Sequence, residues 1–171
     1  MGHALRPEFV AALLLAVAAP AYAAGNVTAV AKSGKIVLTG DAQSNQVSLN
    51  QAGLAPDELR VVPVPGTTVN GDVVPVVLAG ITKGLVAKLG DGDDGLTTSA
   101  VVIAGDVLVK AGAGDDNVSI DRTVSGNVKI ELGDGENNAT LAPMGRIDGT
   151  LHVKAAGGDD DVFVSGTASI G

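Results

Sequence analysis

The sequence predicts an all-β fold, a parallel β-solenoid (β-helix) whose coils are about 22 residues long. The first observation is an acidic, glycine-rich turn that occurs four times, with a glycine at Gly92, Gly114, Gly135 and Gly158. A fixed period of this length is typical of stacked repeats. The second is an alternation of apolar and polar residues between the turns, which is typical of half-buried strands. The third is the lack of convincing helical periodicity after residue 24.

Residues 1–23 have the pattern of a secretory signal peptide. Arg6 lies in a short polar start, and the apolar stretch 10–19 is too short to span a bilayer. The segment Ala21-Tyr22-Ala23 fits the small-x-small cleavage rule. The sequence therefore predicts a secreted protein, extracellular or at the cell surface, without a membrane span after cleavage. The alternative is an apolar N-terminal helix that is retained in the fold.

Residues 24–79 are expected to form irregular N-terminal coils that cap the solenoid. Ile36 and Leu38, followed by a Gly-Asp turn and then by Val47 and Leu49, have the pattern of a degenerate repeat. Proline removes a backbone donor from a ladder and therefore suits an end or edge position. This segment contains Pro63, Pro65 and Pro75.

Residues 80–171 are expected to form the regular coils. In each coil, alternate residues of the first strand should face the core: Leu85, Ala87 and Leu89; Val107, Val109 and Ala111; Val128, Ile130 and Leu132; Leu151, Val153 and Ala155. A shorter second strand should follow each acidic turn. On the solvated outer face, one charged position of each coil should stack into a column, which consists of Lys88, Lys110, Glu131 and Lys154.

The pattern stops at Gly171, where a further coil should begin. A solenoid whose last coil is uncovered has an open edge of unpaired backbone groups. Two interpretations follow. Either the chain is a truncated fragment of a longer repeat protein, or another chain stacks end to end on the last coil.

Composition argues against several kinds of partner. The net charge is −8, which disfavours nucleic acid because phosphate contacts supply much of that affinity. Phe163 is the only aromatic residue after residue 23, so platforms for stacked bases or sugar rings are missing. The chain has no cysteine, and a repetitive core must therefore replace the disulfides that are common in small secreted proteins.

The acidic turns are the candidate site. Stacked coils would place Asp93, Asp115, Glu136 and Asp159 in one column, and Asp94, Asp116, Asn137 and Asp160 in the next. Carboxylates stacked in this way repel one another, and Ca²⁺ would relieve the repulsion because it binds carboxylate and carbonyl oxygens in flexible turns. The candidate metal ligands are Asp91, Asp93, Asp94, Asp115, Asp116, Asp134, Glu136, Asp159, Asp160 and Asp161. The open alternative is a set of solvated turns without metal, since Asp, Asn and Gly are common turn formers.

These turns resemble the hemolysin-type (RTX) calcium-binding repeats. The matching residues are Gly90, Gly92 and Asp94; Gly112, Gly114 and Asp116; Gly133 and Gly135; Gly158 and Asp160. The resemblance implies that Ca²⁺ is held between neighbouring turns. It covers about seven residues of each repeat, and it departs from the family because a turn occurs once per coil instead of every nine residues. The longer coil is more similar to the Gly/Asp-rich secreted β-solenoid proteins that bacteria display at the cell surface.

The sequence therefore predicts a secreted or cell-surface structural or adhesive protein that binds Ca²⁺ at its turns, with a cell-surface or matrix component as partner. The alternative is a metal-free extracellular scaffold or stalk. A polysaccharide-lyase-like β-helix enzyme is the third hypothesis, and it rests on architecture alone. The chain has no Ser/His/Asp grouping, and His152 falls on an outward strand position, so no catalytic residue is predicted.

Overall fold

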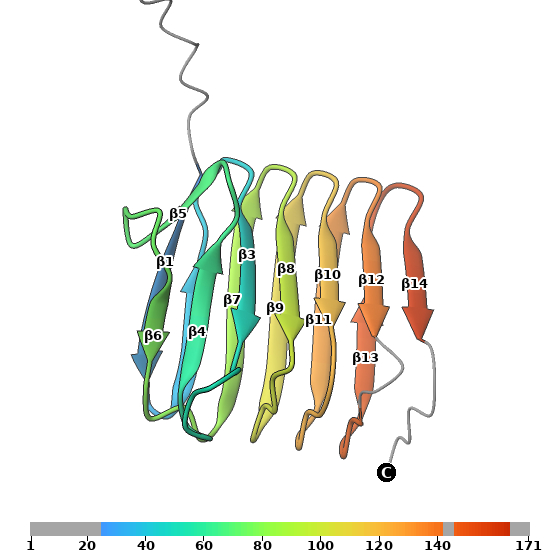
Figure 1. The fold of residues 1–171 in the computed structure, drawn as a ribbon. Helices are drawn as coiled ribbons and strands as arrows, with labels where there is room; N and C mark the ends of the chain where they lie inside the picture. The colour runs from blue at the N-terminus through green and yellow to red at the C-terminus, as the bar shows by residue number, and fades with distance from the viewer. Residues whose placement is uncertain (1–24, 142–145, 165–171) are drawn as a thin grey trace, which may run out of the picture.

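The computed structural model describes residues 25–141 and 146–164, which form two seven-stranded sheets (Figure 1). The first sheet has the order β13-β11-β9-β7-β2-β1-β5, from β1 (Gly25–Lys32), β2 (Lys35–Thr39), β5 (Thr67–Val69), β7 (Gly84–Asp91), β9 (Asp106–Ala113), β11 (Val128–Asp134) and β13 (Leu151–Lys154). The second sheet has the order β14-β12-β10-β8-β3-β4-β6, from β3 (Gln46–Asn50), β4 (Leu59–Pro63), β6 (Val76–Leu78), β8 (Gly95–Ser99), β10 (Asn117–Ile120), β12 (Asn138–Leu141) and β14 (Asp161–Val164). The predicted signal peptide, 1–23, and Gly171 lie outside the described residues.

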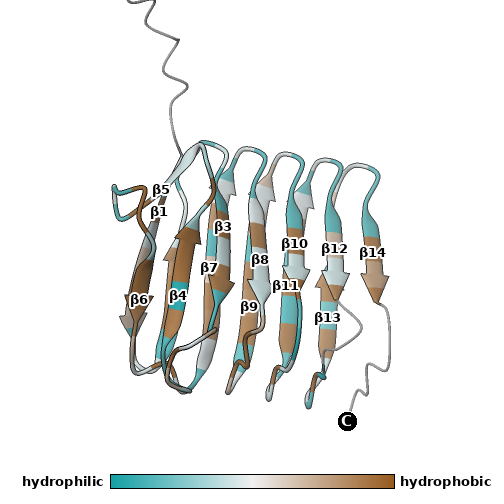
Figure 2. Cartoon of the chain, viewed as in Figure 1, coloured by the Kyte–Doolittle hydropathy of each residue, from teal (hydrophilic) through white to brown (hydrophobic). Residues whose placement is uncertain are grey.

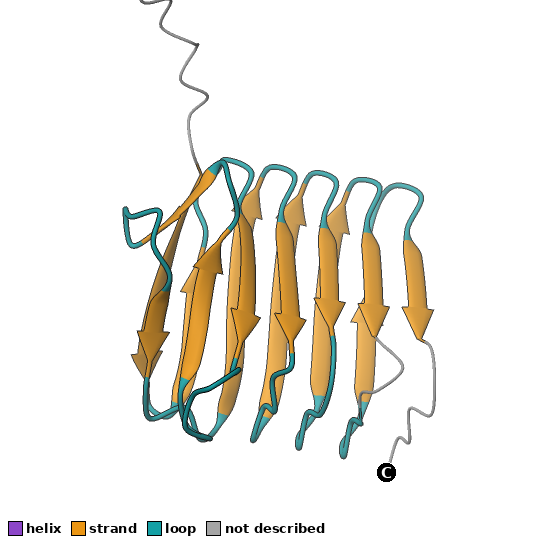
Figure 3. Cartoon of the chain, viewed as in Figure 1, coloured by secondary structure: helices purple, strands orange, loops and turns teal. Residues whose placement is uncertain are grey.

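The all-β prediction is confirmed, and Figure 3 shows only strands and loops in the described chain. The prediction of a parallel β-solenoid is wrong. The strands form two stacked sheets, and each sheet mixes parallel with antiparallel pairs. The antiparallel pairs, β1–β2, β3–β4 and β4–β6, all lie in the N-terminal part of the chain. A two-residue turn produces the first of them, because Ser33 and Gly34 both have positive φ, at 52° and 80°, as a type I′ hairpin requires.

In each regular repeat a segment leads from the second strand to the first strand of the next repeat. A third sheet along these segments would close the coil, and within the described residues they do not form one. In the described chain they contribute single-residue bridges, from Ile103 to Val124 and from Val124 to Ile147, and no continuous ladder. These three side chains are buried, but they add no third sheet. The 22-residue period reports the length of a repeat and carries no information about the number of sheets.

Successive repeats nevertheless stack in parallel, residue above equivalent residue. Val107 of β9 pairs with Val128 of β11, and Val128 pairs with Leu151 of β13. In the second sheet, β8, β10, β12 and β14 pair in the same sense. The parallel pairing extends back to β2, where Ile36 pairs with Leu85, and to β3, which pairs with β8. β2 and β3 therefore pair with the first regular repeat in the same way as the regular repeats pair with one another.

The apolar core lies between the two sheets, and Figure 2 shows apolar and polar bands alternating along the strands. The inward residues predicted for the first three regular repeats are all buried: Leu85, Ala87, Leu89, Val107, Val109, Ala111, Val128, Ile130 and Leu132. In the last described repeat Leu151 and Val153 are half-buried and Ala155 is exposed. Only one neighbouring repeat covers these three residues within the described ranges.

The predicted charged column is also present on the outer face of the first sheet. Lys88, Lys110, Glu131 and Lys154 pair in register from β7 to β13. Glu131 accepts hydrogen bonds from two lysines, at 2.6 Å from Lys110 Nζ and 2.8 Å from Lys129 Nζ. These contacts hold the pKa of the Glu131 carboxyl at about 2, below its ordinary value.

Replacing Glu131 with lysine should lower the melting temperature modestly at low salt. The change leaves consecutive lysines at this position of β7, β9, β11 and β13, and like charges directly opposite one another repel. Melting curves at low salt and at about 1 M NaCl test the cause, because salt at that concentration screens exposed charges. The loss should shrink in high salt, and an equal loss at both salt concentrations would contradict an electrostatic origin.

Candidate functional site

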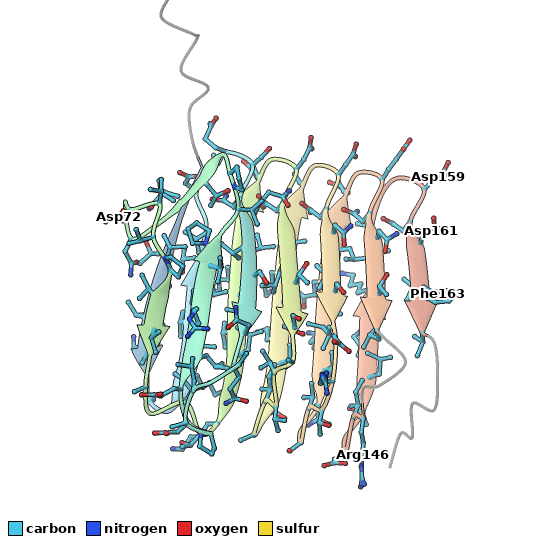
Figure 4. The ribbon with its side chains drawn as sticks, in the orientation of Figure 1. Asp72, Arg146, Asp159, Asp161 and Phe163 are labelled. Atoms are coloured by element: carbon cyan, nitrogen blue, oxygen red, sulfur yellow. The ribbon has the colours of Figure 1, made fainter. Side chains whose placement is uncertain are left out.

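The acidic turns connect the two sheets, joining β7 to β8, β9 to β10, β11 to β12 and β13 to β14. They lie along one edge of the stack, where Figure 4 labels Asp159 of the last described turn and Asp161 at the start of β14. Their backbones approach one another closely. Gly114 has φ of 126°, and a Cβ atom at that position would lie 2.4 Å from Gly92 O of the preceding turn. Glycine is required there for both reasons.

Most backbone amides of the turns continue the ladder between repeats. In the second turn Gly114 N donates to Asp134 O at 3.0 Å, and Asn117 N donates to Asp94 O at 2.8 Å. The two amides between them, of Asp115 and Asp116, bond to side chains of neighbouring turns. The acidic residues therefore satisfy backbone donors at the bend, where backbone acceptors are lacking.

The first set of side chains, the outer column, consists of Ser44, Asp93, Asp115, Glu136 and Asp159. Its hydrogen bonds run toward the following repeat. Ser44 Oγ accepts from Asp93 N at 3.2 Å, Asp93 Oδ1 accepts from Asp115 N at 3.0 Å, and Asp115 Oδ1 accepts from Glu136 N at 2.8 Å. All members of the outer column are exposed.

The second set, the inner column, consists of Asn45, Asp94, Asp116, Asn137 and Asp160. Its hydrogen bonds run toward the preceding repeat. Asp94 Oδ1 accepts from Asn45 N at 2.7 Å, Asp116 Oδ1 from Asp94 N at 2.9 Å, Asn137 Oδ1 from Asp116 N at 2.9 Å, and Asp160 Oδ1 from Asn137 N at 3.1 Å. The inner column is buried except for the half-buried Asp160.

Two carboxyl groups in the inner column are unusual. Asp94 is 1% exposed and Asp116 is 2% exposed, and Oδ2 of each has no hydrogen-bond partner. Burial raises the pKa of Asp94 to about 7, although the backbone amide of Asn45 opposes the shift, and Asp116 and Asp41 add repulsion. Burial likewise raises the pKa of Asp116 to about 6.

The structure brings both predicted carboxylate columns together, but not the other three candidate ligands. Asp91 and Asp134 are separated in their column by Ala113, and Asp134 Oδ1 accepts a hydrogen bond from Gly157 N at 3.1 Å. Asp161 is the first residue of β14 and is exposed. Within 25–141 and 146–164, no three His, Cys, Asp or Glu side chains form a group that could hold a metal ion.

Sequence reasoning missed Ser44 and Asn45 as members of the columns. Their position could have identified them, because Ser44 and Asn45 stand directly before β3 in the same way as Asp93 and Asp94 stand directly before β8. The two residues were not recognised because neither is acidic. Their hydrogen bonds show that the side-chain ladder begins one repeat earlier than the acidic residues do.

His152 is exposed on β13 opposite Lys129, as its outward position predicts. In the part of the chain that the structure describes, no helix is long and apolar enough to cross a membrane. Comparisons with protein-family models, curated proteins and solved structures found no match.

Proposed function

We propose that the protein is a secreted structural scaffold whose acidic turns lock its repeats in register. The observation that carries this proposal is the pair of side-chain columns, in which Asp, Asn and Ser side chains accept hydrogen bonds from turn amides that lack backbone partners. Such bonds to charged acceptors are stronger than those between neutral groups. This structural role accounts for the acidic residues and requires neither a bound metal ion nor a catalysed reaction.

The signal-peptide pattern of residues 1–23, which lie outside the described residues, supports secretion. The outward face of the second sheet supports adhesion to a polar cell-surface or matrix component. Hydroxyl side chains stand there in register on consecutive strands: Ser48, Thr97, Ser119 and Thr140. We assign no catalytic residue to the chain.

Calcium binding at the outer column is the second candidate. Asp93, Asp115 and Glu136 are exposed and stand above one another, with no lysine or arginine in their turns. Unit charges about 4 Å apart repel by ~1 kcal/mol even in water. A bound Ca²⁺ ion would remove that repulsion, and the exposed carboxylate oxygens are ligands of the kind that it prefers.

A calcium titration separates the two candidates. If the hydrogen-bonded columns alone hold the turns, about 5 mM CaCl₂ should raise the melting temperature no more than MgCl₂ does at equal ionic strength. Circular dichroism of the chain without residues 1–23 provides the measurement. A rise with CaCl₂ alone that disappears in an Asp93→Asn/Asp115→Asn variant would contradict the metal-free scaffold and support the calcium site.

A further inference from the structure

The outward surface of the first sheet, here called the lysine face, collects positive charge on an acidic protein. Asp and Glu outnumber Lys and Arg by 19 to 11, and the net charge is −8. Outside the acidic turns, the outward positions of these strands hold only two acidic residues, Asp106 and Glu131. They hold six of the seven lysines of the chain: Lys32, Lys35, Lys88, Lys110, Lys129 and Lys154.

Both acidic residues of the lysine face are already engaged within the protein. Glu131 lies between two lysines, at 2.6 Å from Lys110 Nζ and 2.8 Å from Lys129 Nζ. Asp106 Oδ1 accepts hydrogen bonds from Asn127 N at 2.8 Å and from Asn127 Nδ2 at 3.3 Å. Four lysines of the face form no ion pair within the described ranges: Lys32, Lys35, Lys88 and Lys154.

An apolar row crosses the lysine face. It consists of residues that pair in register on four neighbouring strands, β1, β2, β7 and β9: Val30, Val37, Val86 and Leu108. Val30 is 41% exposed and the other three are half-buried. Lysines flank the row on both sides, Lys32 and Lys35 on one side and Lys88 and Lys110 on the other. At ~3.3 Å per residue, the two flanks lie about 13 Å apart along the strands.

This combination fits an anionic lipid bilayer better than a soluble polyanion. A lysine can extend its stem along apolar surface and place its ammonium group among charged headgroups. An anionic bilayer attracts nearby lysines, and the boundary between headgroups and acyl chains accepts apolar side chains. A hydrophilic polysaccharide would leave the apolar row without a matching surface. Phe163, the only aromatic residue after residue 23, lies on β14 of the second sheet and offers no platform for a sugar ring here.

The overall negative charge of the chain does not prevent this contact. At physiological ionic strength, exposed charges are screened over a distance of about 8 Å. The acidic turns lie along one edge of the stack, and Lys32 and Lys35 lie at the opposite ends of their strands. An anionic surface should therefore meet the chain through the lysine face, and this fixes the orientation of the stack on that surface.

We propose that the lysine face docks on an anionic phospholipid bilayer, with the lysines at the phosphate groups and the apolar row at the boundary with the acyl chains. The two sheets then lie parallel to the membrane, and the hydroxyl side chains of the second sheet point away from it. This inference rests on the proposed secretion, which brings the chain to a membrane surface. It depends neither on the hydrogen-bonded columns nor on calcium.

The test measures the partition of the chain without residues 1–23 onto lipid vesicles by co-sedimentation. Phosphatidylcholine vesicles with about 30 mol% phosphatidylglycerol should bind the protein at low salt at least about tenfold more strongly than vesicles of phosphatidylcholine alone. Binding should weaken at least about tenfold in 0.5 M NaCl, because salt screens the lysines. Similar partition onto the two kinds of vesicle would overturn the proposal.

Two variants of equal charge separate the lysine face from net charge. Lys32→Gln/Lys88→Gln removes one exposed lysine from each side of the apolar row and should lower the partition roughly 10- to 30-fold. The matched control, Arg122→Gln/Arg146→Gln, removes two exposed charges outside the first sheet and should bind as the wild type does. Equal losses for the two variants would overturn the proposal. The single variants replace a double variant that melts below the wild type. A wild-type chain that melts normally but binds no vesicles would overturn this inference and leave the scaffold proposal intact.

A third variant tests the apolar row at unchanged charge. Val37→Thr/Val86→Thr keeps the branched shape of both side chains, adds two hydroxyl groups and should lower the partition roughly threefold. Partition equal to that of the wild type would overturn docking at the acyl boundary. Retention on immobilised polygalacturonate, without binding to vesicles and with loss in the Lys32→Gln/Lys88→Gln variant, would overturn the proposal in favour of an anionic polysaccharide.

Discussion

Replacing Gly112 with alanine should lower the free energy of unfolding by about 3–5 kcal/mol. Gly112 has φ of 135°, which alanine rarely adopts, and its Cβ would lie 1.5 Å from Gly90 O. The contact is with backbone of the paired strand, so no side-chain rotation relieves it. Gly133 stands in the same relation to Gly112, with a Cβ distance of 1.7 Å to the Gly112 carbonyl oxygen. A shift of the backbone at Gly112 therefore disturbs the next repeat too.

Urea denaturation followed by circular dichroism measures this loss. Gly53→Ala is the matched control, because Gly53 also has positive φ, at 73°, but has no atom within 4 Å of a Cβ at its position. The control isolates the conformational cost, which is about 1–3 kcal/mol. Equal losses for the two variants would show that the close approach of the repeats adds nothing.

Replacing Ile130 with alanine should cost about 2–5 kcal/mol. Ile130 is 1% exposed on β11, where it pairs with Val109 on one side and Val153 on the other. The neighbours cannot close the resulting cavity without leaving the register of their own ladders, because parallel pairing fixes the strand spacing.

The same urea experiment tests Ile130→Ala, with Val77→Ala on β6 as its control. Val77 is 46% exposed, and substitution of an exposed residue outside special contacts usually changes stability by about 0.5 kcal/mol or less. A loss for Ile130→Ala as small as that of the control would mean that the space between the two sheets is not a packed core.

The regular strands could be predicted because two signals agree there. The spacing of Gly92, Gly114 and Gly135 marks the turns, and the period-two alternation between them separates inward residues such as Val109 and Ile130 from outward ones. Together they fix which residues stack. They do not fix how many sheets the strands form, since bridging residues such as Val124 are apolar in either architecture.

The fold of the N-terminal part was harder to predict because its sequence signals occur once and do not recur along the chain. The Ser33-Gly34 turn is a recognisable two-residue hairpin connection between apolar stretches, yet it has no counterpart in the later repeats. A search for repeats therefore passes over it. The antiparallel pairs of this part of the chain, β1–β2 and β3–β4, separate the observed two-sheet fold from the predicted one.

The positions of the acidic columns were predictable, and their hydrogen bonding was not. Composition suggested repulsion among Asp93, Asp115 and their neighbours, which led to the calcium hypothesis. In the structure the carboxylates of Asp93 and Asp115 each accept a hydrogen bond from a turn amide of the next repeat instead, and that contact depends on side-chain rotamers and on backbone direction within the bend. A sequence pattern specifies neither.

Because the hydrogen bonds of the two columns run in opposite directions, an interior repeat supplies an acceptor to both of its neighbours. Asp115 serves the amide of the unit after it and Asp116 serves the amide of the unit before it. A duplicated copy of such a unit carries the side-chain acceptors and the turn amides that match those of its new neighbours. Growth of the array by tandem duplication would therefore require no compensating substitutions at the bends, whatever the number of copies.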